Sequence, residues 1–134
     1  MTRAVIIVLA LSLMAPLAGC ERHTKAEQFI LDQSLDLVQR EERSRLPTKI
    51  EVASLSKDKQ SICGYATIGD RKHVPYIIRY SNALPKGGFA TVSVVLTVPP
   101  FKGAPYESQA DQALRIQAEC RAIGHQLPSP SSLD

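Results

Sequence analysis

Residues 62–81, ICGYATIGDRKHVPYIIRYS, decide the fold of this chain. Two runs rich in isoleucine, valine and tyrosine, Ile62 to Ile68 and Val74 to Ser81, flank the polar segment 69–72, which begins with glycine. β-Branched and aromatic residues on both sides of such a turn are typical of antiparallel strands. The stretch therefore predicts a β-hairpin.

Another strand is expected on each side of this hairpin. From Thr48 the period is two, with polar Glu51 between Ile50 and Val52. Phe89 to Val98 has the strongest strand character in the chain. One face of that run should enter the core, and it carries Ala90, Val92, Val94, Leu96 and Val98. Four strands joined by short turns predict an antiparallel meander.

Two positions in the hairpin interrupt a regular pattern. Pro75 has no N–H to donate to a neighbouring strand, so it is expected at an edge or a bulge. Ile62 falls on the face opposite Cys63 and Tyr65. Either Gly64 marks a bulge, or both faces of this strand are partly covered.

A first helix is predicted before the strands. Thr24 and Glu27 have the spacing of a capping box, and residues 25–46 contain neither glycine nor proline before Pro47. Their apolar positions form one broad face, as in a helix that packs on a core.

A second helix is predicted after the strands. Ser108 and Asp111 resemble a helix start, and Gly124 follows Ile123 as a terminating glycine. Cys120 lies on the apolar face of this segment. The expected fold class is α+β, a four-stranded antiparallel sheet flanked by an N-terminal and a C-terminal helix with one disulfide.

The amino terminus has the layout of a secretory signal. Arg3 precedes an apolar run from Ala4 to Ala15, and Pro16 ends that run before small residues. Twelve helical residues cover roughly 18 Å against a hydrocarbon core of about 30 Å, so cleavage is favoured over a permanent membrane span.

The following residues, Leu17-Ala18-Gly19-Cys20, resemble the lipobox of bacterial lipoproteins at every position. The resemblance covers the first twenty residues and implies cleavage before Cys20, with acyl chains attached to that cysteine. Glu21 stands where the family's sorting rule places an inner-membrane retention signal when the residue is aspartate. The resemblance therefore implies a lipid anchor in the periplasmic face of the outer membrane.

These features divide the chain into four segments. The signal peptide covers residues 1–19, the lipidated tether 20–23, the α+β domain 24–125 and a disordered tail 126–134, which contains two prolines and three serines. Three residues separate Cys20 from Thr24, so the tether spans about 10 to 14 Å at full extension. The domain is therefore expected close to its membrane.

The other two cysteines, Cys63 and Cys120, are expected to form one structural disulfide in an oxidising compartment. A redox pair and metal ligands are the alternatives. A redox site usually shows Cys-x-x-Cys and a zinc site needs four ligands, whereas His73 and His125 are scattered and expected in solvent. No metal and no cofactor other than the covalent lipid is expected.

Charge and motifs limit the function. The chain carries a net charge of +3, and loss of Arg3 leaves about +2, which argues against a nucleic-acid partner. No Gly-x-Ser-x-Gly element is present, and Lys86-Gly87-Gly88 lacks the phosphate-loop pattern. We therefore expect a non-enzymatic protein; a small periplasmic enzyme is the least favoured alternative.

The residues most suited to a binding surface are Tyr65, Arg79, Asn82 and Lys86. Tyr76 and Tyr80 are expected in the core and Arg79 outside it. Partners would be membrane lipid and an envelope protein complex, for which the protein would act as a binding or scaffolding accessory. The alternative is an inhibitor that presents the Asn82 to Gly88 loop, or the strand edge near Pro75, to a periplasmic hydrolase.

Overall fold

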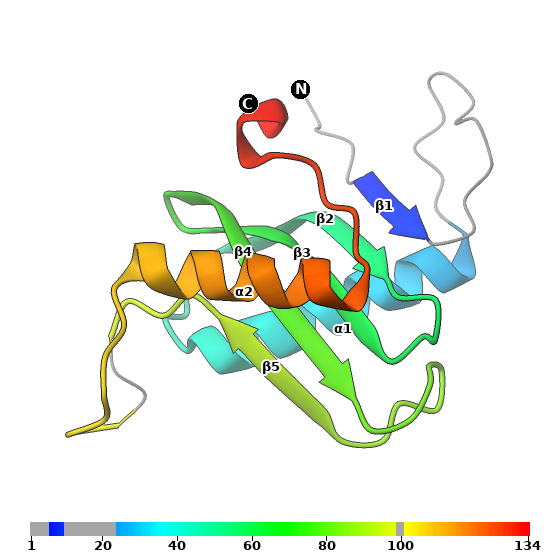
Figure 1. Ribbon diagram of the computed structural model, residues 1–134, viewed down its shortest axis with the longest axis horizontal. Helices are drawn as coiled ribbons and strands as arrows, with labels where there is room; N and C mark the ends of the chain where they lie inside the picture. The colour runs from blue at the N-terminus through cyan, green and yellow to red at the C-terminus, as the bar shows by residue number, and fades with distance from the viewer. Residues whose placement is uncertain (1–5, 10–23, 99–100) are drawn as a thin grey trace.

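The computed structural model describes residues 6–9, 24–98 and 101–134. A sheet with strand order β1-β2-β3-β4-β5 lies between helix α1 behind it and helix α2 in front (Figure 1). The strands are β1 Ile6–Leu9, β2 Thr48–Leu55, β3 Ser61–Ile68, β4 Arg71–Tyr80 and β5 Ala90–Val94. The helices are α1 Lys25–Glu42, α2 Gln109–Ile123 and a short 3-10 helix, η1, Pro130–Leu133.

The expected antiparallel meander is confirmed in β2 to β5, and with it the α+β class. β1 adds a parallel strand at the free edge of β2, with Ile6 opposite Val52 and Leu9 opposite Leu55. The sequence pattern does not predict this addition, because Ile6–Leu9 belongs to the apolar run interpreted as a leader.

Helix α1 begins as predicted and ends earlier. The Thr24 hydroxyl accepts a hydrogen bond from the Glu27 N–H at 3.1 Å, and the Glu27 carboxylate accepts one from the Thr24 N–H at 3.2 Å. The helix stops at Glu42 because Arg43 takes a left-handed conformation with φ 60°. Glu42 then accepts a hydrogen bond from Arg71 at 2.8 Å, which ties the helix end to the start of β4.

Helix α2 has the predicted bounds and apolar face. The Ser108 hydroxyl accepts a hydrogen bond from the Asp111 N–H at 3.1 Å, and Gly124 ends the helix with φ 107°. Ile116 and Cys120 are fully buried against the sheet, whereas Leu114 on the opposite side is 63% exposed.

Both faces of β3 are covered, which resolves the two alternatives left by its sequence. Cys63 faces α2, and its neighbour Gly64 faces α1, under Tyr76. A Cβ at Gly64 would lie 1.8 Å from the carbonyl oxygen of Val52 and 2.7 Å from the Tyr76 hydroxyl. Glycine is therefore required for close packing, and the register irregularities lie elsewhere, at residues 50–52 and 66–68.

The core confirms the expected placement of β4 and shortens β5. Tyr76 and Tyr80 are buried, while Arg79 is exposed. Pro75 lies just past the end of the β5 ladder, which begins at Tyr76 opposite Val94, so it occupies an edge as predicted. Beyond Val94 the strand ends because the backbone of Leu96 pairs with the side-chain amide of Gln112 in α2 at 2.8 and 3.1 Å.

The carboxyl-terminal residues pack against the sheet, contrary to the disordered tail predicted for 126–134. Leu127 packs on the core, and the carbonyl of Pro128 accepts a hydrogen bond from Tyr65 at 3.0 Å. Asp134 reaches His73 at 2.5 Å. The composition misleads here because tertiary partners on β3 and β4 hold a segment that has little structure of its own.

Candidate functional site

The predicted disulfide between Cys63 and Cys120 is confirmed. It joins β3 to α2 with Cα atoms 6.1 Å apart and closes a loop of 57 residues. Both cysteines are at most 1% exposed, so this bond is part of the core. Loop closure of this length corresponds to about 4 kcal/mol of stability on the chain-entropy model.

Of the four residues proposed as a binding surface, Arg79, Asn82 and Lys86 are exposed, and Tyr65 is buried. Tyr65 is 3% exposed, because the tail covers it, and burial raises the pKa of its hydroxyl. Arg79 is exposed and pairs with Glu119 of α2 at 3.3 Å. Asn82 and Lys86 remain exposed and share the loop between β4 and β5. The structure thus removes Tyr65 from the candidate surface and leaves Arg79, Asn82 and Lys86 exposed.

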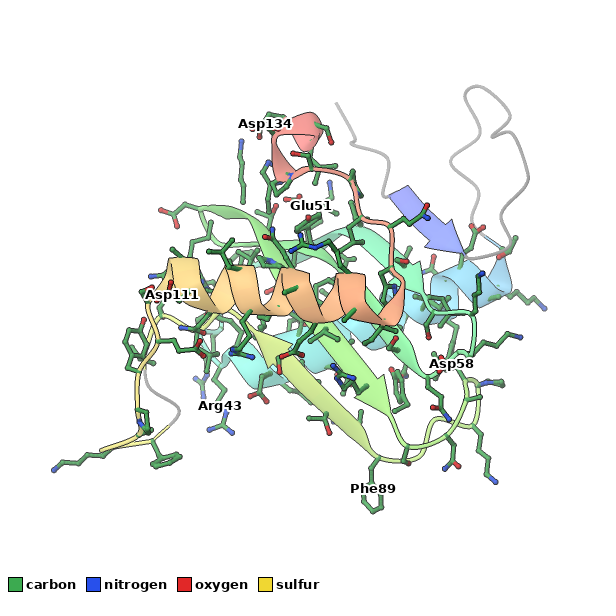
Figure 2. All side chains as sticks on the ribbon, in the orientation of Figure 1. Arg43, Glu51, Asp58, Phe89, Asp111 and Asp134 are labelled. Carbon is green, nitrogen blue, oxygen red and sulfur yellow. A yellow bond between two sulfur atoms is a disulfide. The ribbon has the colours of Figure 1, made fainter. Side chains whose placement is uncertain are left out.

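That loop is anchored from inside and presents an aromatic ring outside. Leu84 is buried, and its N–H donates to the carbonyl of Lys59 at 2.8 Å. Phe89, which follows the loop, is 88% exposed and points away from the body of the protein (Figure 2). The sequence pattern places Phe89 inside a strand, whereas in the structure β5 begins at Ala90 and the Phe89 ring lies in solvent.

An apolar pocket of about 640 Å³ lies where α1 starts, beside the β2–β3 turn and the β4–β5 loop. Its walls are Ala26, Phe29 and Ile30 from α1, Leu55 from β2, and Leu84 and Pro85 from the loop. Lys25, Lys57 and Lys59 also line it. The volume falls in the range of pockets that enclose small ligands. Sequence analysis missed this site because three separate segments build it.

A second pocket of about 240 Å³ lies between α2 and the tail, and His125 lines it. The His125 ring is held between the hydroxyls of Ser54, at 2.9 Å, and Ser61, at 2.8 Å. His125 is 5% exposed, contrary to the expected solvated position, and burial lowers its pKa. Both serines are also buried, so their hydroxyls are not placed to attack a substrate. We therefore interpret this arrangement as part of the core packing.

The second histidine-centred feature is a clasp in which His73 holds Asp134. The His73 ring lies 2.6 Å from Glu51 and 2.5 Å from Asp134, and Figure 2 places Asp134 just beyond Glu51. Hydrogen bonds to Asp134 and then to Glu51 raise the pKa of His73. Burial opposes ionisation of Glu51, but hydrogen bonds from Thr67 and His73 outweigh it and lower the pKa of Glu51. His73 is therefore also not solvated as expected.

The described residues add few other constraints on function. Within residues 24–98 and 101–134, together with 6–9, no group of three or more histidine, cysteine or acidic side chains is placed to hold a metal ion. In the same part of the chain, no helix combines the length and apolar character needed to cross a membrane. The predicted lipidation site, Cys20, and its tether lie outside the described residues.

Comparison with models of protein families, with curated proteins and with solved structures finds no match to this chain. The class that the structure itself defines is a disulfide-linked α+β domain with a helix on each face of its sheet. Any functional assignment therefore rests on the residues and on their geometry.

Proposed function

We propose that this protein is a lipid-anchored binding module of the bacterial cell envelope, attached to the membrane through acyl chains on Cys20. The observation that carries the proposal is the sequence Leu17-Ala18-Gly19-Cys20 directly after an apolar run of leader length. The disulfide between Cys63 and Cys120 supports it, because such bonds persist in oxidising compartments outside the cytoplasm. Two or more acyl chains suffice for stable anchoring.

The anchored domain would act as a non-enzymatic accessory of an envelope complex, at the periplasmic face of the outer membrane. An accessory needs a surface for its partner, and Phe89 supports one, since a phenyl ring 88% exposed beside Asn82 and Lys86 suits a protein contact. The same loop also suits the alternative function, in which the protein inhibits a periplasmic hydrolase. Replacing Phe89 with alanine would weaken either kind of contact. If the protein is an inhibitor, the substitution would also restore the activity of the hydrolase that it inhibits; if it is an accessory, no hydrolase activity would change.

The anchor is tested by growing cells with a labelled fatty acid and measuring the mass of the amino-terminal peptide. The wild-type chain should carry label and begin at Cys20. Cys20→Ala should carry no label and retain residues 1–19, because the lipobox cysteine is required for processing in the lipoproteins it resembles. The double variant Cys63→Ala, Cys120→Ala is the matched control: it should lose the disulfide and keep the label. A labelled Cys20→Ala chain would contradict the proposal.

A further inference from the structure

The apolar pocket lies at the end of the domain where the proposed anchor enters. Helix α1 begins at Lys25, which lines the pocket, and three residues separate Cys20 from the Thr24 cap. In Figure 1 the start of α1, the β2–β3 turn and the β4–β5 loop lie at one end of the protein, while residues 101–105 lie at the other. A tether of about 10 to 14 Å therefore keeps this end next to the bilayer.

The chemistry of the pocket matches a phospholipid with a negative headgroup. The side chains of Ala26, Phe29 and Leu84 supply apolar walls, and Phe29 is 36% exposed. Lys25, Lys57 and Lys59 are exposed at the same site, and in the described part of the chain no ion pair involves them. Apolar walls suit an acyl chain, and ammonium groups suit a phosphate.

Among the residues that the structure describes, acidic groups near the pocket are few. Asp58 lies between two of the lysines but accepts hydrogen bonds within its own turn, from the Ser56 hydroxyl at 2.6 Å and the Gln60 N–H at 3.0 Å. Glu27 takes part in the α1 capping box. In the described part of this end the three lysines therefore exceed the two acids, so the local charge favours an anionic surface.

We propose that the pocket docks on the membrane and takes an acyl chain of an anionic phospholipid, with the headgroup phosphate against Lys25, Lys57 and Lys59. The proposal rests on the proposed lipid anchor, which brings the pocket to the bilayer. It adds a second, non-covalent contact that orients the domain. The lipid-facing end is then the α1 start, and the opposite end, with residues 101–105, faces away from the membrane.

Fluorescence provides the test, because the chain contains no tryptophan. Phe29→Trp places a single reporter in the pocket wall, and Phe101→Trp places one at the opposite end, where Phe101 is 67% exposed. Each full-length protein is reconstituted into vesicles whose phospholipids carry brominated acyl chains, which quench tryptophan on contact. With phosphatidylglycerol present, the F29W signal should be quenched and the F101W signal should stay near its unquenched value. Equal quenching of both reporters, or none at F29W, would overturn the proposal.

The lysines are tested in the F29W background. A triple Lys→Gln variant at 25, 57 and 59 should lower the docking equilibrium about fivefold per lysine. The matched control replaces Lys49, Lys72 and Lys102, which are exposed outside the pocket, and should leave quenching unchanged. Quenching of equal size in phosphatidylcholine vesicles, or equal loss in the two triple variants, would contradict an anionic occupant.

The mass of the amino-terminal peptide, measured on the same samples, separates this inference from the anchor. An acylated chain whose F29W reporter is not quenched would exclude the lipid pocket and leave the anchor standing. A quenched reporter on a chain without acyl groups would exclude the anchor and leave the pocket standing.

Discussion

At the scale of single residues, Gly64 carries the tightest constraint in the sheet. The Tyr76 hydroxyl lies over this glycine and donates to the carbonyl of Val52 at 3.2 Å. Burial raises the pKa of Tyr76, so the phenol stays protonated and keeps its donor. In the sequence, a glycine next to a cysteine within a predicted strand indicates that another part of the protein packs closely against it. The sequence does not say which backbone segment this is.

Replacing Gly64 with alanine should destabilise the protein by about 3 kcal/mol, because the new methyl group has no room and the neighbour at 1.8 Å is backbone. Urea unfolding measures the change. Gly103→Ala is the control: a Cβ there meets nothing within 4 Å, and only the positive φ of 86° opposes it, at about 1 kcal/mol. Equal losses in the two variants would show that packing over Gly64 is looser than the structure indicates.

The two histidines, His73 and His125, should affect stability in opposite pH ranges. The pKa of His73 is raised by Asp134 and Glu51, so its contribution is fully present below the unfolded value near 6.5 and is lost as pH rises through the folded pKa. The pKa of His125 is lowered by burial, so the protein loses stability as pH falls below about 6.5 towards the folded pKa.

Chemical unfolding between about pH 5 and 9 separates these contributions. His73→Gln should cost more stability at the acidic end of this range than at the alkaline end. His125→Gln should show the reverse, with the larger cost at alkaline pH, where the wild-type ring is neutral and paired with Ser54 and Ser61. Parallel pH profiles for both variants would contradict the two assignments.

At the scale of elements, α2 and the tail form one continuous cover over the second face of the sheet. The disulfide fixes α2 to β3, His125 directly follows the helix, and the tail then crosses Tyr65 and ends at His73. Sequence reasoning predicted the helix because its cap and its apolar face are local signals. It could not predict the tail, because the hydrogen bonds that join the tail to the sheet come from Tyr65 and His73, which lie 63 and 61 positions away from their partners.

Stepwise truncation tests this cover. Removing residues 131–134 should abolish the contact between His73 and Asp134 and lower the melting temperature slightly. Removing 126–134 should also uncover Tyr65 and take away the Leu127 side chain that packs on the core. About 1 to 2 kcal/mol of lost burial corresponds to a fall of roughly 4 to 12 °C for a domain of this size. Thermal unfolding followed by circular dichroism measures both steps. Unchanged melting in the longer truncation would show that the tail is not docked in solution.

At the scale of the whole molecule, the core that the described residues form lies between the start of α1 and the tail. Its buried residues run from Ile30 to Cys120, and Leu127 packs against them. In the proposed maturation, cleavage before Cys20 would remove β1 and leave four antiparallel strands with both helices. The edge of β2 would then lack its parallel partner, while the pocket beside Leu55 would keep its α1 and loop walls.

The orientation that follows from anchor and pocket can be measured by amine labelling. In vesicles, Lys25, Lys57 and Lys59 should react more slowly with a water-soluble acylating reagent than the same residues in detergent. Lys72 and Lys102 should react equally in both, because they lie outside the pocket. Mass spectrometry reads each site separately. Protection spread evenly over all lysines would mean that the domain has no preferred face towards the membrane.

The sequence by itself determined the four antiparallel strands, the two long helices and the fold class. Period-two runs, turn glycines, the Thr24 and Ser108 caps and Gly124 are signals within a few residues of each other, so hydrophobic pattern and local hydrogen bonding suffice to read them. It also identified the single cysteine pair of the domain, and it supports the lipid-anchor hypothesis, because a leader is recognised as a linear motif.

Only the tertiary structure decided what lies on the surface. It buried Tyr65 under the tail, enclosed His125 between two serines, exposed Phe89 and assembled the apolar pocket from α1, β2 and the β4–β5 loop. Burial depends on which distant segment covers a residue, and that choice follows from packing two helices and a tail onto one sheet. The physical reason is that local propensities act over a few residues, whereas the free energy of burial is shared among segments far apart in the chain.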